Sequence, residues 1–194
     1  RQEGERARCY LNGRGLQDET IRTFHLGYNP QATYERHEQW GLPLPDDSAK
    51  RIWIPRGIVI PWSIGDTLWR LNVRRPLTAA QIGAGEVKYI GPAGFANALY
   101  NADALSQSAE SPAAKPVILV EGEIDALTIA QACGQEIAAV ATGSTAGGRR
   151  NEWVARLALA PIVLVAFDAD LADQSGYPGA GDRAAAWWLN TLPN

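Results

Sequence analysis

Two short apolar runs in the second half of the chain, Pro116–Val120 and Ile162–Phe167, each lead directly into acidic residues. Polar and apolar residues do not alternate in either run, and the segment between them has apolar positions at helical spacing. Continuous apolar runs of this length, separated by helices, are typical of a parallel sheet covered by helices on both faces. We therefore predict buried strands at both runs and a further strand at Ile137–Ala141.

Helices are predicted around these strands. Ile124–Cys133 has apolar residues at helical spacing and is followed by Gly134, a residue type that commonly ends helices. The segments Asn151–Leu159 and Ala180–Leu192 complete the alternation of strands and helices. This half of the chain is therefore predicted to be an α/β unit.

Acidic residues follow the two apolar runs, where parallel sheets usually carry their binding sites. Glu121 follows the first run, and Asp168 and Asp170 follow the second. The two aspartates are two positions apart and so point to the same side of an extended chain. Taken singly, each acid is more often a surface or capping residue, but three carboxylates at one edge repel each other unless a cation lies between them. They suit a divalent cation such as Mg²⁺, and we expect Glu123 to be a solvated neighbour.

The first half of the chain has a different pattern. Short β-prone runs occupy Ile52–Ile54, Ile58–Trp62 and Thr67–Val73, with a Gly-Asp turn between the last two. This arrangement favours an antiparallel sheet. Asp18–Phe24 is predicted to be a short helix that begins near its acidic residue. The first half is therefore predicted to be a smaller α+β subdomain.

Three tryptophans, Trp53, Trp62 and Trp69, lie within these β-prone runs. Aromatic side chains beside basic residues can stack on nucleobases. Tryptophans in short strands more often fill the core, and we expect that role here.

Residues 106–115 are rich in Ala, Ser, Glu and Pro, a composition that favours a mobile connection. We therefore predict an N-terminal subdomain at 1–105, a linker at 106–115 and a second subdomain at 116–194.

The overall composition excludes few classes of function. The chain has 194 residues, 46% of them hydrophobic, and a net charge of −3, so any nucleic-acid contact must come from a local basic patch. Cys9 and Cys133 are too few for a disulfide framework, and His25 and His37 lack zinc-ligand spacing with them. A reducing cytoplasm is expected, and no apolar run is long enough to span a membrane. Because the chain begins at Arg1 and contains no methionine, we expect a fragment or a processed product.

The acidic segments resemble the Toprim fold that primases, topoisomerases and related nucleases share. The resemblance rests on the segments Glu121–Asp125, Thr142–Ser144 and Phe167–Asp170. Upstream segments are similar to the RNA-polymerase core of bacterial DnaG-type primases, and they follow in the family's order across nearly the whole chain. These are Tyr10–Leu16, Glu19–Ile21, Phe24–Tyr28, Arg56–Pro61, Val73–Arg74, Lys88–Pro92 and Leu99–Tyr100.

The resemblance implies a Toprim-type, mostly parallel sheet flanked by helices and preceded by the α+β subdomain. It implies synthesis of short RNA primers from ribonucleoside triphosphates on single-stranded DNA, with a replicative helicase as a further partner. Asp168 and Asp170 would bind Mg²⁺ or Mn²⁺, and Glu121 would bind metal or accept the proton of the attacking 3′-hydroxyl. Asp125 matches another acidic position of the family, although near a helix N-terminus it could instead complement the helix dipole.

Basic residues in the first half match the family's basic ridge, which contacts template and incoming nucleotide. Arg14, Arg74 and Lys88 stand at those positions. Any one of them taken alone is more often a solvated surface charge. Arg56, Arg70 and Arg75 are nearby and have weaker support from the resemblance.

The chain departs from the family pattern in three places. First, Leu171–Gly179 separates the acid pair from the Ala-Gly element that opens the next helix. Second, Gly91 stands where the family has an asparagine, and the family's further lysine is missing before Leu99. Third, the family's acidic cluster beyond the last helix is missing before Asn194. We therefore expect a primase of a mobile element whose Toprim subdomain is truncated.

Two other functions stay open. The chain could be a degenerate Toprim module that binds DNA or a partner without polymerising. A Toprim nuclease is a third reading, which the primase-like upstream segments disfavour.

Overall fold

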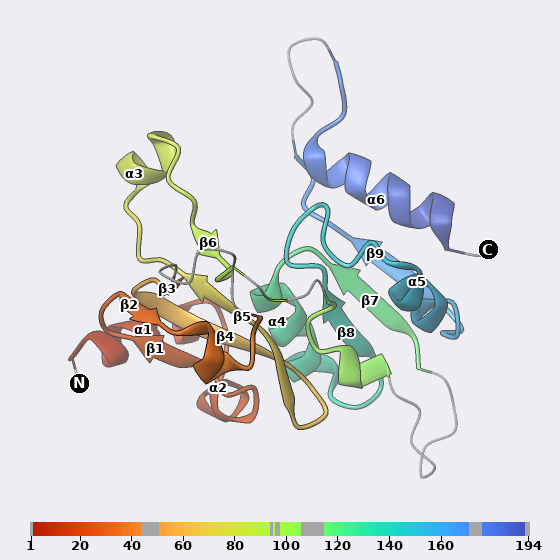
Figure 1. Cartoon of the computed structure of the whole chain (residues 1–194). Coiled ribbons are helices and arrows are strands. Elements are labelled where there is room, and N and C mark those ends of the chain that lie inside the picture. The colour runs from red at the N-terminus through yellow and green to blue at the C-terminus, as the bar shows by residue number, and fades with distance from the viewer. Residues whose placement is uncertain are drawn as a thin grey trace. The chain divides into compact units, whose positions relative to one another are not determined.

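The computed structural model describes residues 2–43, 51–93, 95, 98–105, 115–170 and 176–192 (Figure 1). The chain divides into two compact units, residues 1–62 with 66–96, and residues 63–65 with 97–194. The second unit therefore begins earlier in the sequence than the predicted position 116. Tyr100 forms a β-bridge with Ala141, and the Asn101 side-chain amide donates to the Ala139 carbonyl at 2.8 Å, which explains why this segment belongs to the second unit. The predicted linker lies almost wholly outside the described residues.

The first unit contains two small sheets. The four-stranded sheet has the order β1 (Gly27–Asn29), β4 (Gly57–Ile64), β5 (Thr67–Arg74), β6 (Tyr89–Ile90). The pairs β1–β4 and β5–β6 are antiparallel, as the sequence predicted for this half. The third predicted run, β3 (Ile52–Ile54), lies in a separate antiparallel pair with β2 (Thr33–Glu35).

Short helices accompany these sheets. The helix α2 (Asp18–Thr23) begins at the predicted residue, and α1 (Gln2–Gly13) packs against it and against β1. Only Ala7 and Leu11 of α1 are buried, so its amphipathic pattern is weak and the sequence reading did not find it. The remaining elements are the 3-10 helix η1 (His37–Trp40) and the helix α3 (Ala79–Gly83).

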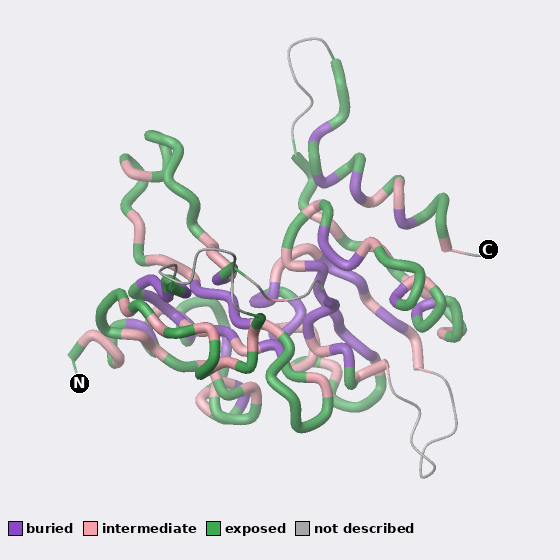
Figure 2. Tube along the Cα trace, viewed as in Figure 1, coloured by how far each residue is buried: buried purple, intermediate pink, exposed green. Residues whose placement is uncertain are grey.

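The core of the first unit forms where β3 and β5 bury their apolar residues. Ile52, Ile54, Leu71 and Val73 form one buried cluster. Figure 2 shows by colour which parts of the trace are buried. Trp62 on β4 is 1% exposed, as expected for a core residue. The expectation for the other two tryptophans is wrong, because Trp53 is 36% and Trp69 is 37% exposed. Their positions lie on strand faces that no described element fully covers.

The second unit is built on a parallel sheet with the order β8 (Ala138–Ala141), β7 (Val117–Val120), β9 (Val163–Ala166). The helix α4 (Glu123–Cys133) packs on β7 and β8, and α6 (Ala180–Thr191) packs on β9 (Figure 1). The helix α5 (Asn151–Leu157) precedes β9, and the 3-10 helix η2 (Ala102–Leu105) lies against β8. The predicted α/β class, a parallel sheet flanked by helices, is therefore confirmed.

Burial differs between the strands of this sheet. The central strand β7 has Val117, Leu119 and Val120 almost fully buried, as predicted. The edge strand β9 alternates instead, and Leu164 is 53% exposed. The prediction of a strand buried on both faces is therefore wrong for β9, because only one face of this edge strand is covered.

Neither cysteine is in a disulfide: Cys9 is exposed and Cys133 is half-buried. Within the described ranges, no helix combines the length and the apolar character needed to cross a bilayer.

Candidate functional site

The three acids that follow the apolar runs lie at one edge of the parallel sheet. Val120, the last residue of β7, is in register with Ala166, the last residue of β9. Glu121 is therefore one residue, and Asp168 two residues, beyond strand ends that are level with each other. Parallel register thus brings together acids that are almost fifty positions apart in the sequence.

These acids influence one another electrostatically. The pKa of Glu121 is raised above its usual value of 4.5, first by burial and then by the negative charges of Asp168, Asp170 and Asp125. Glu121 is half-buried, whereas the three aspartates are exposed. The edge therefore concentrates negative charge around one carboxyl group that holds its proton more tightly than usual.

The turn after β7 places Glu121 and Asp125 close together. Gly122 is the only residue between β7's acid and the start of α4, and a Cβ added there would lie 2.8 Å from a carboxylate oxygen of Asp125. The loop after β8 is fixed to the same place, because the Gly143 amide donates to the Glu121 carbonyl at 2.8 Å and the Thr142 amide donates to the Val120 carbonyl at 3.0 Å. The Thr-Gly-Ser segment of the resemblance therefore supports the acidic edge through its backbone.

The start of α6 lies directly against the acid pair. The Gly181 amide donates to Oδ2 of Asp170 at 2.8 Å, so this carboxylate caps the helix. A Cβ added at Gly181 would lie 2.0 Å from the Asp168 carbonyl oxygen, and one at Gly179 would lie 2.3 Å from the Asp170 Cβ. The Ala-Gly element thus lies next to the acids despite the insert, of which residues 171–175 are outside the described part.

Glu123 behaves differently from the other acids. It is 3% exposed, so the expectation of a solvated neighbour is wrong. The pKa of Tyr100 is raised by burial and then by the charge of Glu123, which places this carboxylate in the interior of the second unit. No sequence signal separates Glu123 from Glu121, because both stand in the same short acidic segment.

The acids have the right chemistry for a hard divalent cation, since carboxylate oxygens are the ligands that Mg²⁺ and Mn²⁺ prefer. The candidate ligands are Glu121, Asp125, Asp168 and Asp170. Within the described ranges, however, no three acidic, histidine or cysteine side chains converge closely enough to form a ready-made metal site. The donor set therefore fits the metal in kind, and binding would require these side chains to move toward one another.

The predicted basic residues gather in the first unit. Arg74 ends β5 and is in register with Tyr89 of β6, so Lys88 lies beside it at the sheet edge. The pKa of Lys88 is lowered by burial and then by the positive charges of Arg74 and Arg14. The structure thus brings Arg14, Arg74 and Lys88 within electrostatic reach of one another.

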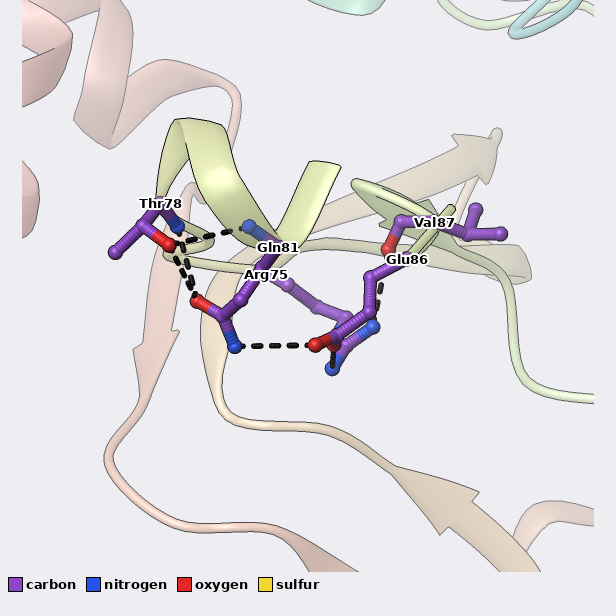
Figure 3. A network of polar contacts seen from close by, with 5 residues as sticks. All are labelled: Arg75, Thr78, Gln81, Glu86 and Val87. Carbon is purple, nitrogen blue, oxygen red and sulfur yellow. Dashed lines mark hydrogen bonds and ion pairs between the residues drawn. The ribbon is translucent and has the colours of Figure 1, made fainter. Parts of the chain in front are cut away.

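The three weaker candidates are engaged in local contacts. Nε of Arg56 donates to the Tyr28 hydroxyl at 3.0 Å, and the guanidinium of Arg70 lies 4.9 Å from the centre of the Trp62 ring. Arg75 forms an ion pair with Glu86 at 2.7 Å and donates to the Val87 carbonyl at 3.1 Å (Figure 3).

The contacts of Arg75 belong to a larger polar network that shapes the segment leading to Lys88. Thr78 and Gln81 form a capping box at the start of α3, and the Gln81 side chain donates to Glu86 at 3.2 Å (Figure 3). The network therefore fixes the path of the chain between β5 and Lys88.

Comparison with solved structures identifies the fold. The chain matches a DNA primase domain from Pseudomonas aeruginosa with a TM-score of 0.62 and 26% identity, over 94% of this chain and 57% of that one. It matches the DnaG catalytic core with a TM-score of 0.62 and 20% identity, over 95% of this chain and 59% of that one. It also matches the RNA polymerase domain of Mycobacterium tuberculosis primase DnaG in complex with double-stranded DNA. That match has a TM-score of 0.57 and 17% identity, over 96% of this chain and 72% of that one.

This chain spans only about three fifths of the Pseudomonas aeruginosa primase domain and of the DnaG catalytic core, so the likeness concerns one part of those proteins. No protein-family model matches the sequence, and a search of curated proteins finds no match.

Proposed function

We propose that this chain, which has the fold of a DnaG-type primase core, synthesises short RNA primers from ribonucleoside triphosphates on single-stranded DNA. The observation that carries the proposal is the cluster of negative charge around Glu121 at the carboxyl edge of a primase-type sheet. A replicative helicase is the proposed partner, and the cytoplasm is the proposed location.

The acids would serve phosphoryl transfer in separate roles. A bound Mg²⁺ or Mn²⁺ would neutralise the triphosphate and the charge that develops in the transition state. Asp168 and Asp170 would hold this ion, and the second oxygen of Asp170 keeps the start of α6 in place. Glu121, whose pKa is raised, is suited to accept the proton of the attacking 3′-hydroxyl. Asp125 would complete the negative environment from the first turn of α4.

Arg14, Arg74 and Lys88 would contact the phosphates of the template or of the incoming nucleotide. Their mutual repulsion, visible in the lowered pKa of Lys88, would be relieved by a phosphate among them. A primase RNA polymerase domain with a similar fold has been solved in complex with double-stranded DNA, which supports a nucleic-acid role for the chain.

A non-polymerising, DNA-binding function is the second candidate. It is favoured by one observation: in the described part of the chain, no three candidate ligands converge on a metal position. A nuclease is less well supported, because the similarity to primases extends over more than nine tenths of the chain and includes the upstream unit.

A primer-synthesis assay distinguishes these functions. The chain with its native flanks would be given single-stranded DNA, labelled ribonucleotides and Mg²⁺ or Mn²⁺. We expect short RNA products, and we expect Asp168→Asn and Asp170→Asn each to reduce their yield at least about 100-fold, because each removes a metal-binding charge. Glu152→Gln is the matched control, since Glu152 is an exposed acid of the same unit that pairs with Arg150 at 3.2 Å and is not a candidate metal ligand.

The alternatives give different results. DNA binding without labelled product, in wild type and variants alike, would establish the non-polymerising module. Shortened DNA without new RNA would establish the nuclease.

A further inference from the structure

We propose that Arg149 is a positioning residue for the candidate metal site, because it holds α6, and through α6 the side chain of Asp170, in place beside Glu121. Arg149 lies in the second unit, near the end of the loop that joins β8 to α5. The inference rests on the proposed function, since it takes Asp170 as a ligand of the metal.

The beginning of this loop is attached to the backbone of Glu121. The Gly143 amide donates to the Glu121 carbonyl at 2.8 Å. The Thr142 hydroxyl donates to the Ser144 carbonyl at 2.8 Å, and the Gly147 amide donates to the same carbonyl at 3.0 Å. The loop therefore folds back on itself and forms a compact support next to Glu121.

The end of the loop contacts α6. The guanidinium carbon of Arg149 lies 4.8 Å from the centre of the Trp187 ring, and its Nη2 donates to the Thr145 carbonyl at 2.7 Å. Beside it, a Cβ added at Gly148 would lie 3.5 Å from the side chain of Trp188. Arg149 thus joins the backbone of the loop to a turn of α6 that the loop closely approaches.

The two tryptophans restrict α6 in different ways. Trp188 is completely buried and anchors one side of the helix in the core. Neighbouring residues of a helix point about 100° apart, so Trp187 lies on another side. The contact between Arg149 and Trp187 therefore restricts rotation of α6 about its anchored side.

The first turn of the same helix holds Asp170. The Gly181 amide donates to Oδ2 of Asp170 at 2.8 Å. Residues 181 and 187 are about 9 Å apart along the helix axis, and the hydrogen-bonded backbone between them moves as a unit. A rotation of α6 at Trp187 would therefore move the Gly181 amide relative to Asp170.

Repulsion between the acids makes such a restraint useful. Glu121 experiences the negative charges of Asp125, Asp168 and Asp170, and like charges at one edge favour separation. A helix that is fixed in orientation opposes this separation in the metal-free protein. It also reduces the conformational entropy that is lost when a cation binds.

The surroundings of Arg149 indicate a task beyond filling space. Its Nε is buried and has no hydrogen-bond partner among the described residues. A buried donor without an acceptor is unfavourable, and an apolar side chain of similar length would fill the same space without this penalty. The contact of the guanidinium with Trp187 is a task that an apolar side chain does not perform in the same way.

The test compares two arginines of the second unit that lie over tryptophan rings. Arg149→Gln removes the contact between the loop and α6. Arg156→Gln is the matched control, because the guanidinium carbon of Arg156 lies 5.1 Å from the centre of the Trp153 ring and both residues belong to α5. Its loss therefore breaks a similar contact that does not involve α6.

The first measurement is hydrogen exchange of backbone amides, followed by NMR on the full chain in EDTA. We expect the Gly181 amide to exchange about fivefold faster in Arg149→Gln than in wild type, while the Leu119 amide of β7 keeps its rate. A merely structural role would accelerate both amides equally, because both would then exchange through unfolding of the whole unit.

The second measurement is calorimetric titration with Mn²⁺. Arg149→Gln should weaken Mn²⁺ binding about fivefold, and Arg156→Gln should leave it unchanged. Trp187→Phe keeps a ring for the guanidinium and should bind Mn²⁺ nearly as wild type does, whereas Trp187→Leu should weaken binding as Arg149→Gln does. In Asp170→Asn, the further change Arg149→Gln should have no additional effect, because Arg149 acts through Asp170.

The two measurements separate this inference from the proposed function. Equal exchange of the Gly181 amide in wild type and Arg149→Gln would overturn the inference, as would an equal loss of Mn²⁺ affinity in Arg156→Gln. Absence of Mn²⁺ binding in wild type would instead contradict the metal site of the proposed function, and exchange of the Gly181 amide still decides whether Arg149 positions α6.

Discussion

At the scale of single residues, Glu121 is the side chain whose surroundings say most about the site. It is half-buried beside three aspartates, and its carboxyl group therefore resists ionisation. An acid with a purely structural role usually shows the opposite, because its partners stabilise the charged form and lower its pKa.

The raised pKa of Glu121 predicts how stability depends on pH. The folded chain binds this proton more tightly than the unfolded chain does, so the free energy of unfolding falls as pH rises from the usual value of 4.5 through the folded pKa. Glu121→Gln should therefore raise the melting temperature at pH 7 in EDTA, and the difference should shrink below about pH 4.5. The measurement is a series of thermal melts across this range. A variant that is less stable at neutral pH would show that Glu121 is stabilised in its charged form.

Gly181 is a second residue whose role follows from geometry. A Cβ at this position would lie 2.0 Å from the Asp168 carbonyl oxygen, so one of the two backbone segments would have to shift. Gly181→Ala should therefore destabilise the chain by about 1–3 kcal/mol, as overpacking of a buried contact does. Chemical denaturation gives the value.

The control for this substitution is Gly4→Ala in α1, where nothing lies within 4 Å of the added methyl group. It should stabilise the chain by about 0.5–1 kcal/mol, because alanine favours a helix over glycine. Similar effects of the two substitutions would mean that the approach of α6 to Asp168 is not a tight one.

At the scale of elements, the pairing of β5 with β6 is what gathers the basic residues. Arg74 stands opposite Tyr89, and the network around Thr78, Gln81 and Glu86 fixes the segment between them (Figure 3). A charge cluster assembled by strand pairing keeps its geometry, so each side chain can make one defined phosphate contact.

This arrangement predicts the salt dependence of DNA binding. If Arg74 and Lys88 each contact one phosphate, as proposed, Arg74→Ala and Lys88→Ala should each weaken binding of single-stranded DNA and reduce the slope of log K against log salt by about 1. Fluorescence anisotropy at several salt concentrations measures the slope, with Arg22→Ala as the control outside the cluster. Slopes that match wild type in both variants would place the DNA contacts elsewhere.

At the scale of the whole molecule, the acids of the candidate metal site and the basic cluster lie in different units. The acids lie in the second unit and the basic cluster in the first, although the net charge of the chain is only −3. The small net charge is therefore compatible with two local clusters of opposite charge, each suited to a different partner.

The acidic field should bind metal weakly in the absence of substrate. Mg²⁺ requires nearly ideal octahedral coordination, and the acids of the described residues form no ready-made site, so we expect a dissociation constant above about 1 mM. Mn²⁺, which tolerates a wider range of ligands, should bind more tightly. Calorimetric titration of both ions into the chain and into Asp168→Asn tests this, and Mg²⁺ binding in the micromolar range would show that the acids are already assembled.

The sequence alone determined the three strands and the helices α4, α5 and α6 of the second unit, and the position of Glu121, Asp168 and Asp170 after their strands. Runs such as Val117–Val120 are too apolar to be exposed, and an acid directly after such a run must emerge at the end of the strand. The helix starts at Asp18 and Ala180 were also predictable, because they depend on residues next to them in the chain.

Only the tertiary structure decided which residues are covered. Glu121 and Glu123 stand two positions apart in one acidic segment, yet the first lies at the open edge and the second is buried. Trp62 is in the core while Trp53 and Trp69 are partly exposed, and β9 is covered on one face only. A cavity of about 450 Å³ beside Arg74 is lined by residues from positions 3 to 77, which no local pattern connects. The physical reason is that local sequence sets backbone conformation and side-chain alternation, whereas burial and electrostatic environment depend on the elements that the rest of the chain brings alongside.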